Sequence, residues 1–259
     1  MLGRRGIEIK SAEQIQAMRQ AGLVVARALH TLAEQARPGM RTADLDAIAH
    51  DMIRDQGATP SFLGYHGFPA VICTSVNEEV VHGIPGDRVL NDGDLLSIDC
   101  GAIVDGWHGD AAVTVCIGAV PDQMRRLSEI TERAMWAGLR QARAGNRLSD
   151  ISHAVETTVR SAGDFGVVQD YTGHGIGTAM HMPPAIPNHG APGHGPTLKV
   201  GMALAIEPMV TMAGPVVQVL SDGWTVVTVD DSWAAHWEHT VAVTPDGPWV
   251  LTALDDVRL

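Results

Sequence analysis

Two apolar stretches of the sequence each lead to a carboxylate. In "GDLLSIDC" (93–100) the presumed strand ends on Asp99, and in "GMALAIEP" (201–208) a similar strand ends on Glu207. Burying an ionised carboxylate is costly unless it is paired or bound to a metal ion. The two stretches therefore suggest related strands that present acids to a metal site.

A tight hairpin would bring a second acid toward Asp99. Asp105-Gly106 lies between two apolar stretches, and this dipeptide favours a type I′ turn, which needs positive φ at both central residues. With that turn, Gly101 faces Asp110, and Asp110 lies diagonally across from Asp99 on the same face. A register shift of one residue would place the two acids on opposite faces.

The second half of the chain offers a counterpart to this hairpin. "WEHTVAVT" (237–244) resembles "GDAAVTVC" (109–116), which matches Glu238 with Asp110. Four neighbouring carboxylates would repel one another, and some would take up protons. Two divalent cations with bridging carboxylates relieve that repulsion and form a common hydrolytic design. Exposed strand-end acids are the alternative, which we favour for any single acid but not for four in matching positions.

Several histidines could complete such a site. His174 lies between glycines in "GHGIG" (173–177), and a neutral imidazole is a good ligand for Zn, Fe, Co or Mn. His82 and His181 hold matching positions in the two halves and would flank the site. The histidines interpreted as structural or exposed are His30, His50, His153 and His194. Those left unassigned are His66, His108, His189, His236 and His239.

An internal repeat organises the chain. Residues 36–57 align without gaps with residues 142–163, and the matching strands follow in the same order. Chance similarity of two amphipathic helices is the alternative. Each half predicts a long helix, a second helix and then strands, with helices of the second half near 121–143 and 148–162. Ser11 with Gln14 predicts a capping box at the first helix.

The predicted architecture is one catalytic domain, residues 1–259, with pseudosymmetric halves of about 10–117 and 118–250. The chain has 259 residues and a formal net charge of −12, which disfavours non-specific binding to nucleic acid or to an anionic membrane. We recognise neither a signal peptide nor an apolar run long enough to span a membrane. Three cysteines without a CxxC motif favour the cytoplasm.

These motifs together resemble the type I methionine aminopeptidases, which have the creatinase or "pita-bread" fold. The resemblance covers roughly residues 9–251 and rests on "NEEVVHGIP", "LLSIDCGAIVDGWHGD", "GHGIG", "AIEPM" and "WEHTVAVT". It implies an α+β fold in which two pseudosymmetric halves pack helices on a curved, mainly antiparallel sheet. The spacing between Glu207 and Glu238 leaves no room for the helical insertion of the type II enzymes.

The resemblance also implies roles for individual residues. The implied ligands of two divalent metal ions (Co, Mn, Fe or Zn) are Asp99, Asp110, His174, Glu207 and Glu238. Catalysis would use Glu207 as the general base, with His181 at the oxyanion and His82 at the scissile amide. The residues implied to bind substrate are His82, His181, Tyr65, Phe68, Cys73, Met180 and Trp224.

The implied reaction is hydrolytic removal of the N-terminal methionine from nascent proteins and peptides, with preference for a small second residue. By the same rule, Met1 of this chain should be retained, because Leu2 follows it. Phe62 stands where many relatives have cysteine, and "MPPAIPNHG" follows His181 in place of an acidic pair.

Two other functions belong to the same fold. An X-Pro aminopeptidase or prolidase-like enzyme would use the same five ligands but usually carries a substantial N-terminal domain. A non-catalytic binding protein of this fold would have lost metal ligands, and none is missing here. The expected partners are nascent polypeptide N-termini, and the chain is expected to be a monomer. A transient ribosome contact is in doubt, because residues 200–257 contain no Lys or Arg.

Overall fold

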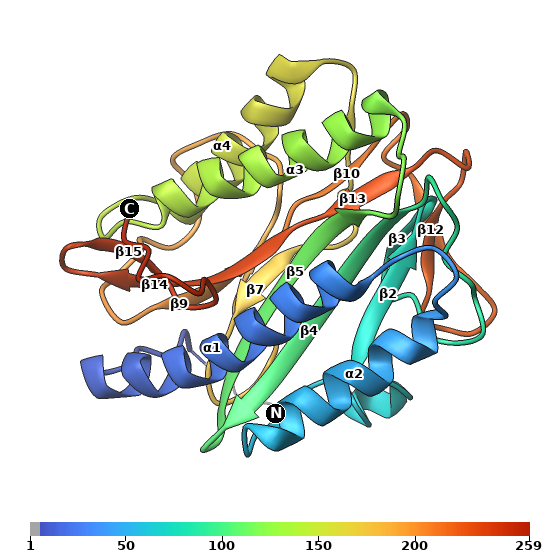
Figure 1. Ribbon diagram of the computed structural model, residues 1–259. Coiled ribbons are helices and arrows are strands. Elements are labelled where there is room, and N and C mark those ends of the chain that lie inside the picture. Colours follow the sequence, from blue (N-terminus) through green and yellow to red (C-terminus); the bar gives the residue numbers. More distant parts are fainter. Residues whose placement is uncertain (1–5) are drawn as a thin grey trace.

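The computed structural model describes residues 6–259 and shows helices layered on a curved sheet (Figure 1). The prediction for Met1 and Leu2 lies outside the described residues. Within residues 6–259 there are four α-helices: α1 (Ala12–Gln35), α2 (Thr42–Asp55), α3 (Asp122–Gln141) and α4 (Leu148–Ala162). The helices predicted near 121–143 and 148–162 are therefore confirmed.

The sheet layer of the described chain consists of one nine-stranded sheet and two three-stranded sheets, with antiparallel pairing throughout. The large sheet contains β1 (Thr59–Pro60), β2 (Ile72–Val76), β4 (Leu95–Val104), β5 (Trp107–Cys116), β7 (Gly173–Gly175), β8 (Met182–Ile186), β9 (Ala203–Ile206), β14 (Glu238–Thr244) and β15 (Gly247–Val250). One small sheet contains β6 (Gly166–Val167), β10 (Met209–Thr211) and β13 (Ala234–His236). The other contains β3 (Glu79–Val81), β11 (Val217–Val219) and β12 (Val226–Thr228).

The helix starts show how local sequence sets the elements. Ser11 and Gln14 form the predicted capping box at α1, each side chain bonding to the other's backbone N–H. At α2, the backbone N–H of Arg41 donates to the Asp44 carboxylate, and at α4 the N–H of Arg147 donates likewise to Asp150. These second helices of the two halves thus begin in the same way, which supports the proposed internal repeat.

Each helix pair covers its own half of the sheet. Apolar residues of α1 and α2, among them Leu32 and Leu45, pack with Ile98 of β4 in one buried cluster. Leu139 of α3 packs in a second cluster with Leu204 of β9. In Figure 1, α1 and α3 lie across the strands on the same side. The opposite face of the sheet is thereby left to carry polar side chains.

The expectation that the first strand ends on Asp99 was wrong. Strand β4 continues past Asp99 to Val104, because β5 pairs with it along its full length. Alternation along the strand puts Ile98 and Cys100 in the core and Asp99 on the other face. None of the helices within residues 6–259 is both long and apolar enough to cross a membrane.

Candidate active site

One cavity brings together all twelve residues implied by the motifs. Its volume is about 120 Å³. One side, which we term the carboxylate wall, consists of Asp99, Asp110, His174, Glu207 and Glu238. The other side, which we term the apolar wall, consists of Phe62, Tyr65, Phe68, Cys73, Met180 and Trp224. His82 and His181 line the same cavity.

The β4–β5 hairpin has the register expected from its turn. Gly101 pairs with Asp110, and Asp105 and Gly106 have φ values of 49° and 80°. Asp99 pairs with Ala112, so Asp110 is its diagonal neighbour on the same face. The prediction of two aspartates on one face of this hairpin is confirmed.

The acids of the second half join those of the first through β14. Glu238 pairs with Ala112 of β5, which places it beside both aspartates. On its other edge, His239 of β14 pairs with Ile206 of β9. Glu207 directly follows Ile206, so the same register sets it opposite Glu238. The β4–β5 hairpin of the first half and the β9–β14 strand pair of the second half therefore meet along β5 and β14.

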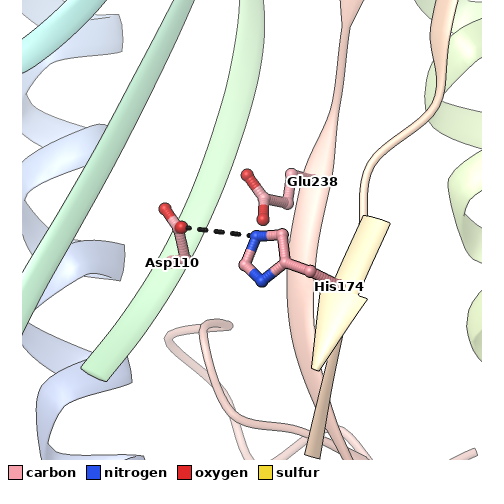
Figure 2. Close-up of side chains that lie close together, drawn as sticks. All are labelled: Asp110, His174 and Glu238. Carbon is pink, nitrogen blue, oxygen red and sulfur yellow. Dashed lines mark ion pairs between the residues drawn. The ribbon is translucent and has the colours of Figure 1, made fainter. Parts of the chain in front are cut away.

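His174 completes the carboxylate wall from β7. Its Nε2 lies 3.4 Å from Glu207 Oε1 and 3.9 Å from Asp110 Oδ2. Figure 2 shows this ring directed toward Asp110 and Glu238. Nδ1 lies 3.0 Å from the carbonyl oxygen of Gly175, to which it can only donate. The proton therefore sits on Nδ1, and the lone pair of Nε2 faces the acids, as metal coordination requires.

The acids of the carboxylate wall have raised pKa values and lack hydrogen-bond partners for some of their oxygens. Burial raises the pKa of Asp99 to about 7 and that of Glu207 to about 8. Burial, and then the neighbouring acids, also raise the pKa values of Asp110 and Glu238. Three buried oxygens of this wall have no hydrogen-bond partner among the described residues: Asp99 Oδ1, Asp110 Oδ1 and Glu238 Oε1. Unpartnered buried oxygens beside a neutral imidazole are a donor set that fits divalent cations.

His82 and His181 stand at the edge of this wall. The ring of His181 lies 4.3 Å from that of His174, and its Nδ1 is 2.9 Å from the Tyr65 hydroxyl. Burial lowers the pKa of His82 to about 4 and also lowers that of His181. Both imidazoles are therefore neutral near pH 7.

The apolar wall is an aromatic cluster with one thioether. Phe68 meets Trp224 edge to face at 5.1 Å and Phe62 at 6.5 Å between ring centroids. Cys73 and Met180 are buried in the same cluster. The ring of Phe62 fits because residue 101 is glycine. Any other residue at this position would place its Cβ 2.7 Å from Phe62 Cε1. Phe62, the departure from many relatives, is thus part of the cavity lining.

The other histidines divide by exposure. Those interpreted as structural or exposed, His30, His50, His153 and His194, are all exposed. Of the unassigned ones, His236 belongs to the site region: its Nε2 lies 3.7 Å from Glu207 Oε2, and it could hold an ion together with Glu207 and Glu238. The sequence reasoning missed it. The available signal was its spacing, because a residue two before Glu238 shares its face of an extended strand.

Known proteins are similar to this chain in sequence and in fold. The sequence matches metallopeptidase family M24 over residues 16–245. Methionine aminopeptidase 1 of Mycobacterium tuberculosis is 55% identical over 256 residues, which are 96% of either chain. The methionine aminopeptidase of Clostridium acetobutylicum is 52% identical over 95% of this chain and 98% of its own. The crystal structure of methionine aminopeptidase from Rickettsia prowazekii matches with a TM-score of 0.94 at 40% identity, covering 95% of this chain and 100% of that one.

The chain therefore belongs to metallopeptidase family M24, and within it to the type I methionine aminopeptidases of the pita-bread fold. The predicted α+β fold class is confirmed by the same structural match. The X-Pro peptidase and the non-catalytic binding protein are not favoured, because the relatives of highest identity given above are named methionine aminopeptidases.

Proposed function

We propose that this chain is a metal-dependent aminopeptidase that hydrolytically removes the N-terminal methionine of peptides and nascent proteins. One observation carries the proposal: four carboxylates and an imidazole line one small cavity together with an aromatic, thioether-containing cluster. The carboxylate wall suits metal-assisted hydrolysis of a peptide bond. The apolar wall suits binding of an unbranched, polarisable side chain such as that of methionine. The relatives of highest identity given above are named for this activity.

Two divalent ions would be held by the carboxylate wall. One is assigned to Asp110, His174, Glu207 and Glu238, and the other to Asp99, Asp110 and Glu238. The raised pKa values and unpartnered oxygens of these acids support the assignment. Bound divalent ions supply Lewis acidity, which acidifies water and polarises the scissile carbonyl. Co, Mn, Fe and Zn all suit this donor set.

The side chains have complementary parts in the reaction. Glu207 would be ionised in the metal-loaded enzyme, and its carboxylate takes the proton from the attacking water. His181 Nδ1 lies 2.9 Å from the Tyr65 hydroxyl. With that hydroxyl as the donor, the ring proton is on Nε2, where it can donate to the oxyanion. His82 hydrogen-bonds to the scissile amide and assists departure of its nitrogen.

The apolar wall selects the substrate. Phe68 and Trp224 form a right-angled corner that receives the methionine side chain, with Met180 and Cys73 beside it. The cavity volume is about 120 Å³, and the preference for a small second residue is taken from the resemblance to the methionine aminopeptidases.

The remaining proposals concern the setting of the enzyme. Residues 1–259 act as one catalytic domain, with the site on the seam between the halves. The enzyme works as a cytoplasmic monomer on nascent polypeptide N-termini. Any ribosome contact would be transient and would not use basic side chains of residues 200–257, which contain none.

The test is release of methionine from Met-Ala-Ser by chelated protein before and after addition of Co(II) or Mn(II). Wild type is compared with Glu207→Gln, which keeps the shape of the side chain and removes the base. We expect metal-dependent release by wild type and a loss of about 10²- to 10⁴-fold in the variant. Absence of release by folded, metal-loaded wild type would refute the proposal.

A further inference from the structure

His236 lies behind the carboxylate wall and does not line the cavity. It is the last residue of β13, and only 2% of it is exposed. Its Nε2 is buried and has no hydrogen-bond partner among the residues that the structure describes. An unpaired buried polar nitrogen is costly, so a specific neighbour of Nε2 should explain its presence.

The backbone of His236 is held firmly by the first half of the chain. Its N–H lies 3.0 Å from Thr114 Oγ1 and 3.2 Å from Ser97 Oγ. Its carbonyl accepts a hydrogen bond of 2.7 Å from the Thr114 hydroxyl. Ser97 of β4 pairs with Thr114 of β5. The backbone of His236 is therefore hydrogen-bonded to the sheet, which fixes the position of its imidazole beside the carboxylates.

Of the carboxylates near Nε2, which include Asp99 and Glu238, Glu207 is the one within 4.0 Å among the described residues. Met209 pairs with His236 in the β10–β13 ladder, and Trp237 N–H donates to Pro208 O. This register puts Glu207 diagonally across from His236 on one face, where side chains can meet. The distance between His236 Nε2 and Glu207 Oε2 is 3.7 Å. The other oxygen, Oε1, faces His174 Nε2 at 3.4 Å, so each oxygen of Glu207 faces a different imidazole.

We propose that His236 is a positioning residue, which donates a hydrogen bond from Nε2–H to Glu207 Oε2 and so fixes the orientation of the Glu207 carboxylate. The separation is about 0.7–0.8 Å longer than a usual N–H···O hydrogen bond, and the proposal requires a rotation of the Glu207 side chain that closes this gap. His236 cannot touch substrate, because it lies outside the cavity lining. This inference rests on the proposed function, since it concerns the same carboxylate.

The consequence is a division of labour between the two oxygens of Glu207. With Oε2 held from behind, Oε1 is directed toward His174 and the assigned ion site. A residue that orients a metal-ligating carboxylate typically contributes 10- to 100-fold in ion affinity or activity. Loss of the His236 donor should therefore weaken both ion binding and turnover.

The test uses three variants of the full chain and measures Mn(II) affinity by calorimetry, together with kcat and KM on Met-Ala-Ser. His236→Leu removes the donor, and His236→Gln keeps an N–H at a similar distance from the backbone. His239→Leu is the matched control, because His239 follows on the same segment but hydrogen-bonds to Thr252, away from Glu207.

We expect His236→Leu to lose about 10-fold or more in Mn(II) affinity and in kcat, with little change in KM. His236→Gln should stay within about threefold of wild type, and His239→Leu should keep its Mn(II) affinity. Unchanged affinity and kcat in His236→Leu would overturn the proposal. So would one fewer bound ion per chain in both His236 variants, because His236 would then be a metal ligand.

A second measurement is made on the wild-type protein, and a variant serves only to assign the signal. Nitrogen-15 NMR of the histidine rings of wild type, assigned with His236→Gln, reports which ring nitrogen carries the proton. The proposal requires the Nε2–H form of His236 in the protein loaded with diamagnetic Zn(II), and the Nδ1–H form would overturn it. Ion affinity and this tautomer can both be measured even if the chain proves inactive on methionine peptides. Failure of the proposed aminopeptidase activity can therefore be distinguished from failure of the proposed role of His236.

Discussion

The carboxylate wall and the apolar wall of the cavity are built in different ways. Four of the five polar residues lie on strands of the large sheet, and Glu207 directly follows one of them. The apolar wall draws only Cys73 from that sheet. Its other residues come from connections, such as the segment around Tyr65 and the turn that carries Trp224 between β11 and β12.

This difference assigns catalysis to the carboxylate wall and selection of the substrate side chain to the apolar wall. Paired strands fix the relative positions of the acids through backbone hydrogen bonds, and metal ligands tolerate little displacement. The connections carry aromatic rings whose contacts can change without altering the sheet. Changes in the carboxylate wall should therefore abolish turnover, whereas changes in the apolar wall should alter which residue is removed.

Two glycines offer the strongest way to break this comparison. A Cβ at Gly175 would lie 2.2 Å from the Pro183 carbonyl oxygen, so Gly175→Ala must displace β7 and with it His174. Because the Pro183 carbonyl is a backbone group, it cannot avoid the new Cβ by a side-chain rotation. We therefore expect a loss of at least about 100-fold in kcat/KM together with weaker Mn(II) binding. Gly101→Ala is the matched change directed at the apolar wall: Gly101 lies on β4 opposite Asp110, and its Cβ would meet the Phe62 ring and the Ser61 side chain.

For Gly101→Ala we expect Mn(II) affinity near that of wild type and a smaller loss, about 10-fold, on methionine peptides. Calorimetry and peptide kinetics on both variants provide the measurement. Equal losses of ion affinity in the two variants would contradict the separation of the walls.

Trp224→Leu should sharpen the comparison with an intermediate effect. The variant opens the corner against Phe68 and removes part of the methionine contact. We expect KM for Met-Ala-Ser to rise about 10-fold with kcat nearly unchanged, because the lost contact is present before and during reaction. The measurement is kcat and KM on Met-Ala-Ser and on Leu-Ala-Ser. A drop in kcat alone would argue against a binding role of Trp224.

The smallest predicted effect is on stability. In metal-free protein the raised pKa values of Asp99 (about 7) and Glu207 (about 8) mean that the folded state holds protons that the unfolded state has released. Stability is therefore lost as pH rises through these values. The buried histidines have lowered pKa values, so their contribution is complete above about pH 6.5 and does not mask the trend.

Thermal unfolding of chelated protein between pH 7 and 8.5 measures this loss. We expect the Tm to fall by a few degrees without metal and to stay nearly constant with Mn(II), which holds the acids ionised. Parallel curves with and without Mn(II) would show that these acids do not bind the ion.

The two walls also differed in how far the sequence revealed them. Asp99, Asp110, Glu207 and Glu238 could be grouped from strand repeats and one turn, because strand periodicity decides which residues share a face. Phe68 and Trp224 come together only through the path of long connections, which no local pattern encodes, so they were implied by resemblance alone. The end of β4 was misjudged because a polar residue interrupts the apolar run without interrupting the ladder.

The central claim is that the carboxylate wall acts through bound metal. The most direct measurement is titration of chelated wild type and Asp110→Asn with Mn(II), with ion binding and methionine release from Met-Ala-Ser followed together. Asp110 is assigned to both ions, so we expect wild-type activity to rise in step with bound Mn(II), and the variant to bind weakly and release almost nothing. Release that persists in chelated wild type, or full activity in Asp110→Asn, would contradict the account.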